Sequence, residues 1–597
     1  MYGYHGKILR INLKTQEVKV ETLDLDTAKK FIGGRGLGTK FMMDEVDPKV
    51  DALSPENKLM VVTGPLTGTA TPTGGRYMVV TKSPLTGTIA SSNSGGFWGA
   101  ELKFCGYDMI ILEDKSEEPI YLNIVDDKIE FKSAKHLWGK LVGEVTDELQ
   151  EAHGAKARVM TIGPAGENLS LLAAIMNEKD RAAGRSGVGA VMGSKNLKAI
   201  VVKGSNKVGI HDPEALKAVF KDSLKKIREN GVTGEGLPTY GTAVLVNIIN
   251  ENGAYPVNNF QESYDPEADK ISGESMKEDY LVRKNPCYRC PIACGRWVEV
   301  DGKQMAGPEY ETLWAFGSDC GIRDLKEVLL ANDWCNELGL DTISAGTTLA
   351  AAMELRELDL VKAEEIEGQP LEFGNVNAIV EWTKKMAYRE GFGDKLAEGS
   401  YRLCDMYGRP DLSMSVKKQE LPAYDPRGIQ GQGLQYATSN RGGCHVRGYL
   451  ISPEILGLPE KIDKNALDGK AFWAKAFQDL TASIDSAGLC LFTSFALGAD
   501  DYAALINAVC GTDHTGDTIF AAGERIWNIE KMFNLESGVA PSEDKLPRRL
   551  LEDAIPDGPS KGQVHQLDKL LPEYYELRGW TKGGIPTDER LAELGLK

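Results

Sequence analysis

Short runs of apolar and β-branched residues recur through the first 210 residues or so of the chain. Runs of this length that are bounded by glycine, proline, aspartate or asparagine are typical of β-strands. The pattern therefore predicts a mostly β region, with strands over residues 8–13, 77–80, 109–112, 120–124 and 198–202.

The pattern changes at Asp212. Asp212 and Pro213 match an N-cap followed by proline at the first helical position, and Glu214 falls in the first turn. Helical patterns dominate from here to the end, for example over residues 345–355 and 471–489. The chain is therefore predicted to be an α+β protein with a domain boundary near residue 210.

Composition narrows the class of protein. The 597 residues are 42% hydrophobic and 26% charged, with a formal net charge of −18. This balance is typical of a folded globular protein, and the negative charge argues against a nucleic-acid binder. No signal peptide and no apolar run long enough to cross a bilayer is visible, so the sequence predicts a cytoplasmic protein without membrane contact.

Three of the ten cysteines form a C-x2-C-x3-C motif, at residues 287, 290 and 294. Thiolates at this spacing can point at one centre, and a cubane iron–sulfur cluster needs a fourth, distant cysteine. A structural zinc site with a distant Cys or His ligand is the main alternative, and three buried, unligated cysteines are another. The spacing is the reverse of that usual in radical enzymes that cleave S-adenosylmethionine.

Cys490 is the best candidate for the fourth thiolate. It ends the segment 485–490, which repeats a Gly-Leu pair followed by an acidic or metal-binding residue that also occurs in segment 336–341. Chance is the alternative explanation, because Gly-Leu pairs are common. Four basic residues bracket the clustered cysteines, and they either steer an acidic electron carrier or only offset the cluster's charge: Arg283, Lys284, Arg289 and Arg296.

Glycine-rich segments at 63–69, 73–76, 91–96 and 181–189 form a second signal. Glycines allow backbone N–H groups to face an anion, and Arg76, Arg181 and Arg185 can pair with phosphate. Each segment alone could be an ordinary turn, and none fits the dinucleotide or P-loop pattern. Together they predict a large, phosphate-bearing cofactor.

At this point the sequence resembles the tungsten-dependent aldehyde ferredoxin oxidoreductases. The matching segments are 64–69, 72–77, 93–96, 187–199, the cysteine motif and 485–490, and the resemblance runs from Tyr2 to about Leu594. It implies a β base domain over residues 1–210 that cradles a bis-pterin cofactor. Two mainly helical domains follow, over residues 211–418 and 419–597, and the boundary at 418 comes mainly from the resemblance.

The resemblance also implies the cofactors. Tungsten is held by two pterins (a tungsten bis-molybdopterin, or tungstopterin), and Mg²⁺ bridges their phosphates. One [4Fe–4S] cluster would be held by Cys287, Cys290, Cys294 and Cys490. The implied cofactor contacts are Arg76, Asn93, Gly95, Arg181, Ala182, Gly184 and Arg185 from the base, with Asn336, Leu340, Asp341, Arg441, Asp485 and Leu489 opposite.

Two positions depart from the family pattern. Asn336 stands where the first Gly-Leu segment usually begins with aspartate, so its pterin contact loses a charge. The stretch 330–333 lacks the Glu and His ligands with which dimeric relatives bind iron between subunits, and no histidine occurs between His211 and His445. We therefore expect no interfacial iron, and a monomer or a different assembly.

The implied reaction is the oxidation of an aldehyde to a carboxylic acid, with electrons passing through the cluster to ferredoxin. Glu311 matches the family's proposed general base, and His445 matches a residue that hydrogen-bonds near the metal. Without the resemblance, Glu311 could be a paired or solvated charge and His445 a turn cap.

Other functions stay open at this stage. Relatives of the same fold reduce activated aromatic acids as coenzyme A esters or oxidise glyceraldehyde-3-phosphate. The chain could instead be a subunit of a larger electron-transfer complex. A zinc-stabilised binding protein is the weakest alternative.

Overall fold

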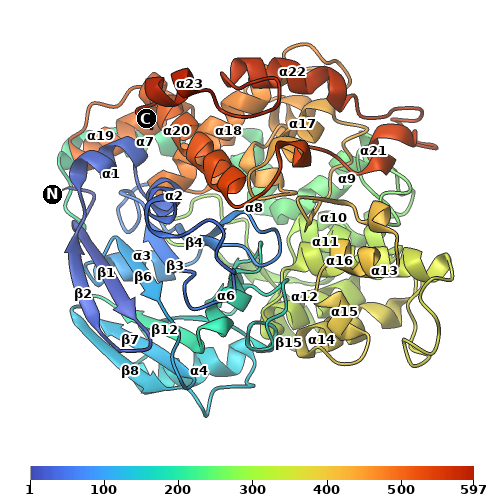
Figure 1. Ribbon diagram of the computed structural model, residues 1–597, viewed down its shortest axis with the longest axis horizontal. Coiled ribbons are helices and arrows are strands. Elements are labelled where there is room, and N and C mark those ends of the chain that lie inside the picture. The colour runs from blue at the N-terminus through green and yellow to red at the C-terminus, as the bar shows by residue number, and fades with distance from the viewer. Residues whose placement is uncertain (1) are drawn as a thin grey trace.

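The computed structural model describes residues 2–597 (Figure 1). Its N-terminal part contains two six-stranded sheets. The first has the order β2-β1-β6-β3-β4-β5: β1 Lys7–Asn12, β2 Val18–Thr22, β3 Leu59–Thr63, β4 Tyr77–Lys82, β5 Ile89–Ser94 and β6 Met109–Glu113. The second has the order β11-β10-β9-β12-β7-β8: β7 Ile120–Val125, β8 Lys128–Ser133, β9 Arg158–Thr161, β10 Ile175–Asn177, β11 Arg181–Ala183 and β12 Leu197–Lys203.

The two sheets share one apolar layer. Leu9, Val61 and Ile110 of the first sheet lie in the same buried cluster as Leu122 and Ile200 of the second. The other face of the first sheet packs on α2 and α20, which is why its strands are apolar at consecutive positions rather than at alternate ones. The first sheet is therefore covered on both faces.

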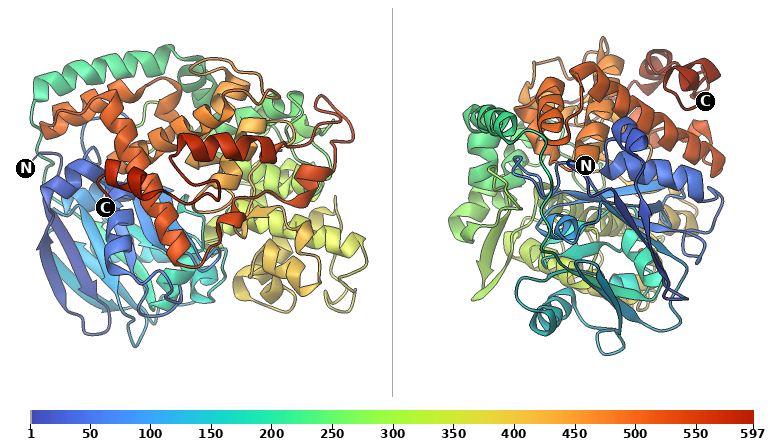
Figure 2. Two further views of the ribbon diagram at one scale, coloured as in Figure 1. Left: turned by 45° about the horizontal axis from the view of Figure 1, so that its top comes forward. Right: turned by 90° about the vertical axis from the view of Figure 1, so that its left-hand side faces the viewer.

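Helices make up most of the remaining chain, and Figure 2 shows them packed over one side of the sheets. The base itself contains α1 Leu25–Phe31, α2 Gly34–Glu45, α3 Trp98–Phe104, α4 Val142–His153, α5 Pro164–Glu167 and α6 Val188–Ser194. A three-stranded sheet, β13 Leu281–Lys284, β14 Arg296–Val300 and β15 Lys303–Ala306, and a small pair, β16 Ser415–Val416 and β17 Gln419–Glu420, lie among the later helices.

The helices of the middle region are α7 Pro213–Glu229, α8 Leu237–Tyr240, α9 Leu245–Glu251, α10 Gly273–Asp279, α11 Tyr310–Phe316, α12 Leu325–Leu338, α13 Thr342–Glu357, α14 Val376–Tyr388, α15 Gly393–Leu396 and α16 Ser400–Met406. Those of the last region are α17 Gln430–Thr438, α18 Lys470–Ala487, α19 Ala499–Cys510, α20 Gly516–Glu536, α21 Arg548–Glu552, α22 Leu567–Leu577 and α23 Asp588–Glu593. None of the helices in residues 2–597 combines the length and the apolar content that crossing a bilayer requires.

The five predicted strands and the helix after Asp212 are confirmed. The Asp212 side chain accepts hydrogen bonds from the backbone N–H groups of Glu214 and Ala215, as expected for an N-cap. The helix predicted over 471–489 ends earlier, at Ala487, because Gly488 adopts a left-handed φ of +86°. The α+β class is confirmed, and we keep 210 and 418 as proposed domain boundaries.

The repeated Gly-Leu segments have a structural explanation. Each lies where a long helix ends against the base, α12 at Gly339 and α18 at Gly488, and both glycines have positive φ. A Cβ on Gly163 would lie 2.3 Å from the carbonyl oxygen of Leu338, and a Cβ on Gly64 would lie 2.3 Å from that of Ala487. The two helix ends therefore touch the backbone of the base directly.

A buried ion pair fastens α2 of the base to α20. Arg35 is fully buried, and its Nε and Nη2 atoms each donate a 2.7 Å hydrogen bond to the Glu530 carboxylate. We expect Glu530→Ala to lower the free energy of unfolding by about 3–5 kcal/mol, because it leaves the Arg35 charge buried and uncompensated.

Denaturant unfolding measures this effect. The matched control is Asp44→Ala, also paired with a cation of α2 but with a side chain 48% exposed, for which we expect a loss of about 0.5 kcal/mol or less. Equal losses in the two variants would show that the buried ion pair stabilises the protein no more than the exposed pair does.

Candidate functional site

A cavity of about 360 Å³ lies between the base and the helical regions. Most of the predicted site residues line it. They are Arg76, Gly95, Arg181, Ala182 and Gly184 from the base, with Cys287, Cys294, Glu311, Asn336, Leu340, Asp341 and His445 from the later segments.

Of the other predicted cofactor contacts, Arg185, Arg441, Asp485 and Leu489 are buried and Asn93 is half-buried. Asn93 accepts a hydrogen bond from Arg76 at 3.0 Å and donates one to Asp485 at 3.1 Å. Arg185 donates to Asp341 at 3.1 Å. Arg441 donates to the Ser91 carbonyl at 2.8 Å, and Leu489 precedes Cys490 at the end of α18. The structure thus gathers the residues that the sequence singled out.

The four predicted cluster cysteines surround a second, smaller space that adjoins the cavity. Cys287, Cys290, Cys294 and Cys490 all line it, and all four are free thiols. Residues 2–597 hold no group of His, Cys, Asp or Glu side chains placed to bind a single metal ion. Four thiols around one space match the ligand number of a cubane cluster and also that of a structural zinc site.

Arg76 connects the two spaces. Its Nη2 donates to Cys490 Sγ at 3.2 Å, while its Nη1 donates to Asn93 Oδ1 at 3.0 Å. Burial lowers the pKa of Arg76, but the four cysteine sulfurs outweigh this effect and raise its pKa overall. A permanent positive charge therefore lies between the cysteine sulfurs and the cavity.

Without a bound metal, Cys290 and Cys294 are unfavourable as thiolates. Burial, followed by the charges of Cys490 and Cys287, raises the pKa of Cys290 to about 12. The pKa of Cys294 is raised well above its ordinary value, first by burial and then by Glu309 and the other cysteines. A bound metal reverses this preference, because it deprotonates its thiol ligands.

Glu311 and His445 lie next to each other in the cavity lining. Glu311, in the first turn of α11, accepts a 2.9 Å hydrogen bond from the backbone N–H of Ala423 through Oε2. Its Oε1 has no hydrogen-bond partner within residues 2–597 and lies 3.6 Å from Nε2 of His445. Nδ1 of His445 is also without a partner among the described residues. Both side chains therefore have an atom that is free to form a hydrogen bond at the cavity.

The electrostatics set their protonation states. Burial raises the pKa of Glu311 from 4.5 to about 8, and the Ala423 N–H only partly offsets this. Burial and the nearby guanidinium groups of Arg185 and Arg441 lower the pKa of His445 well below its ordinary value. His445 is therefore neutral near pH 7, and Glu311 is poised to exchange a proton there.

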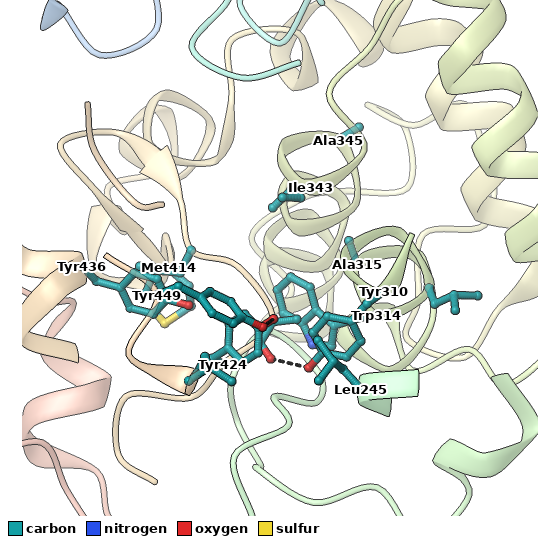
Figure 3. Packing of buried hydrophobic residues seen from close by; sticks show 14 of the residues in the cluster. Leu245, Tyr310, Trp314, Ala315, Ile343, Ala345, Met414, Tyr424, Tyr436 and Tyr449 are labelled. Carbon is teal, nitrogen blue, oxygen red and sulfur yellow. Dashed lines mark hydrogen bonds between the residues drawn. The ribbon is translucent and has the colours of Figure 1, made fainter. Parts of the chain in front are cut away.

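An aromatic wall closes one side of the cavity. Tyr310, Tyr424 and Tyr449 line it together with Leu245 and Ile343, and Figure 3 shows these rings gathered beside Leu245. The hydroxyl groups of Tyr424 and Tyr449 share a hydrogen bond of 2.9 Å. The sequence prediction missed these residues because isolated tyrosines carry no spacing signal.

The prediction also missed a group of buried cations beside Asp485. Arg447 donates to Asp485 and to the Ser91 carbonyl, and Arg35 Nη1 lies 3.5 Å from Asp485. Burial, with Arg441 and Arg35, lowers the pKa of Arg447 to about 9, and its Nε has no partner. Arg35 follows Gly33 and Gly34, as Arg76 follows two glycines, so that signal could have found it.

Comparisons with known proteins point to one family. The model of the aldehyde ferredoxin oxidoreductase N-terminal domain matches residues 8–204, and that of domains 2 and 3 matches residues 218–596. The chain is 56% identical to the tungsten-containing aldehyde ferredoxin oxidoreductase of Pyrococcus furiosus, over 100% of this chain and 99% of that protein. The corresponding protein of Thermococcus kodakarensis is 54% identical over the same shares.

A solved structure shares the fold. The active-site complex BamBC of benzoyl coenzyme A reductase superposes with a TM-score of 0.87 at 26% identity, covering 100% of this chain and 97% of the matched one.

The raised pKa of Glu311 makes a prediction for stability. Between pH 4.5 and about 8 the folded protein keeps the Glu311 proton, while the unfolded chain has lost it. The free energy of unfolding should therefore fall as pH rises through this window, by about 1.4 kcal/mol per pH unit relative to Glu311→Gln, and should level off above it.

Denaturant unfolding of both proteins at several pH values across the window measures the difference. Two parallel curves would show that Glu311 ionises as readily in the folded protein as in the unfolded chain.

Proposed function

This chain belongs to the aldehyde ferredoxin oxidoreductase family, and from that premise we propose which residues bind its cofactors and which act on the aldehyde. The protein is an oxidoreductase that converts aldehydes to carboxylic acids with ferredoxin as electron acceptor, and its family implies a tungsten pterin cofactor. One observation carries the assignment: Cys490 lies with the three clustered cysteines at the edge of a cavity that also holds Glu311 and His445.

We assign one [4Fe–4S] cluster to Cys287, Cys290, Cys294 and Cys490. Four free thiols around one space support this ligand set. Arg76 would hydrogen-bond to the Cys490 sulfur and compensate part of the cluster's negative charge. Electrons would then leave through the [4Fe–4S] cluster one at a time.

We assign the pterins to the cavity and to the cations behind it. Arg76 and Arg181 line the cavity, and Arg447 Nε, a buried donor, is without a partner. Guanidinium groups of this kind suit pterin phosphates, which Mg²⁺ would bridge. Asp341 and Asp485 lie at the two helix ends that meet the base, which matches one segment for each pterin.

When bound, the tungsten centre accepts the two electrons that an aldehyde loses as water supplies the second oxygen of the acid. The protein's own residues handle the protons. Glu311, with Oε1 free, would take a proton from water or from the hydrated aldehyde. Neutral His445 would donate one hydrogen bond to the carbonyl oxygen and fix its orientation. The buried setting keeps other water from this step.

Two further assignments follow the sequence. We keep the cytoplasm as the proposed location. We also propose an assembly without interfacial iron. In the stretch 330–333, which matches the iron-binding stretch of dimeric relatives, Asp333 is paired with Lys303 and Asn332 donates to the Ala306 carbonyl.

Glu311 is the residue whose loss should remove the most activity. We expect Glu311→Gln to lower kcat for aldehyde oxidation by about 10²–10⁴-fold with unchanged tungsten and iron content, because the amide cannot accept the proton. In the unaltered protein kcat/KM should rise with pH up to about 8, as Glu311 ionises. A Glu311→Gln protein with full metal content and full turnover would remove this residue from the mechanism.

Cys490 should be required for the cluster. We expect anaerobically purified Cys490→Ala protein to lose most of its iron and its iron–sulfur absorption, because three thiolates hold the cluster weakly. Cys510→Ala is the matched control, since Cys510 is a half-buried thiol away from the four ligands, and its iron content should stay unchanged. Full iron content in the Cys490 variant would contradict the proposed ligand set.

A further inference from the structure

The loop of clustered cysteines reaches the protein surface, whereas the fourth cysteine does not. Cys287, Cys290 and Cys294 are half-buried, and Arg289 between them is exposed. Cys490 is buried and accepts a hydrogen bond from Arg76, and Cys287 and Cys294 line the cavity. Cys290 does not line the cavity and follows the exposed Arg289, so an electron from the cavity would reach the outside at the loop 287–290.

Four cations surround this loop, and we call them the basic face: Arg158, Arg283, Lys284 and Arg289. Arg283 and Lys284 are exposed on β13, which ends just before the cysteine motif, and Arg158 begins β9. None of the four takes part in an ion pair within residues 2–597. Arg296, which the sequence grouped with them, is buried and donates to the Cys294 carbonyl, so it does not belong to the surface.

Aromatic rings hold three of these guanidinium groups in place. Arg158 lies 4.7 Å from the ring centre of Phe97, Arg283 lies 5.1 Å from that of Trp297, and Arg289 lies 5.9 Å from that of Tyr288. Phe97 and Tyr288 contact each other edge to face at 6.2 Å. The contact between Phe97 and Tyr288 connects Arg158 to the cysteine loop. The rings hold the three guanidinium groups in position without neutralising their charge.

Most nearby carboxylates are engaged in other hydrogen bonds. Glu101 accepts one from the Gly204 N–H, and the exposed Glu309 accepts one from the Thr242 hydroxyl. Glu178 is half-buried and accepts a hydrogen bond from the Phe97 N–H, and burial raises its pKa to about 7. Asp180 is paired with Arg181 and Asn285. Glu299 is the exposed carboxylate of the neighbouring strand β14. Four cations without an ion-pair partner among the described residues therefore lie together beside the cysteine loop of a chain whose net charge is −18.

We propose that ferredoxin docks on the basic face, with its acidic surface over the loop 287–290; this rests on the function proposed above. Charge complementarity would bring a small acidic iron–sulfur protein to the loop that carries three half-buried cysteines and the exposed Arg289. Each docking event moves one electron from the reduced cluster to oxidised ferredoxin, and two such transfers complete the oxidation of one aldehyde.

The test reverses two charges that touch neither cofactor nor substrate. The double variant Arg283→Glu/Lys284→Glu, as holoenzyme, is compared with Lys217→Glu/Lys221→Glu, which reverses two exposed, unpaired lysines on α7. We expect kcat/KM for ferredoxin to fall by about tenfold or more at low ionic strength in the first variant only. The difference should shrink as salt is added. With benzyl viologen as acceptor, kcat should stay unchanged in both variants.

Calorimetric titration with oxidised ferredoxin separates docking from turnover. Weaker binding in the first variant alone supports the proposal. An unchanged kcat/KM and Kd for ferredoxin would overturn it, as would an equal loss in the α7 variant. A different result would be that the unaltered holoenzyme binds ferredoxin and yet oxidises no aldehyde with the dye as acceptor. That result would overturn the proposed function but not the docking of ferredoxin on the basic face.

Discussion

The site depends on the contact of Gly488 with the base domain. Because Gly488 has no Cβ and a left-handed φ, the end of α18 can lie directly against Gly64, and the Gly488 carbonyl accepts a hydrogen bond from the backbone N–H of Arg76. That contact places Cys490 beside Arg76, although the two residues are 414 positions apart. Without it the fourth thiolate would not meet the other three.

The same contact sets the electrostatics of the site. Arg76 lies between the cysteine sulfurs and Asn93, and Asn93 in turn contacts Asp485. A chain of direct hydrogen bonds therefore connects Cys490 through Arg76 and Asn93 to Asp485. Farther along the cavity, burial leaves Glu311 and His445 in opposite situations, a carboxyl group that holds its proton near neutral pH and an imidazole that does not. This division suits a reaction in which electrons and protons leave by different routes.

The sequence predicted the parts of this arrangement that have a local signal. Strand runs, the Asp212 N-cap, the cysteine motif and the glycine-flanked Arg76 and Arg185 all follow from spacing and residue type. The residues that it missed have no such signal. Arg447 owes its importance to three neighbours from distant segments, Tyr424 and Tyr449 meet only through the tertiary fold, and Arg296 looked like a surface charge until its burial was seen. Which face of a segment is buried is decided by packing between domains, which a single sequence does not display.

The central claim is that four thiolates from two distant segments hold one iron–sulfur cluster beside the cavity. A crystal structure of anaerobically purified protein, with anomalous diffraction recorded on both sides of the iron absorption edge, tests it most directly. The account predicts one compact group of iron atoms enclosed by the sulfurs of Cys287, Cys290, Cys294 and Cys490. Iron at any other place, or a single zinc ion among these cysteines, would contradict it.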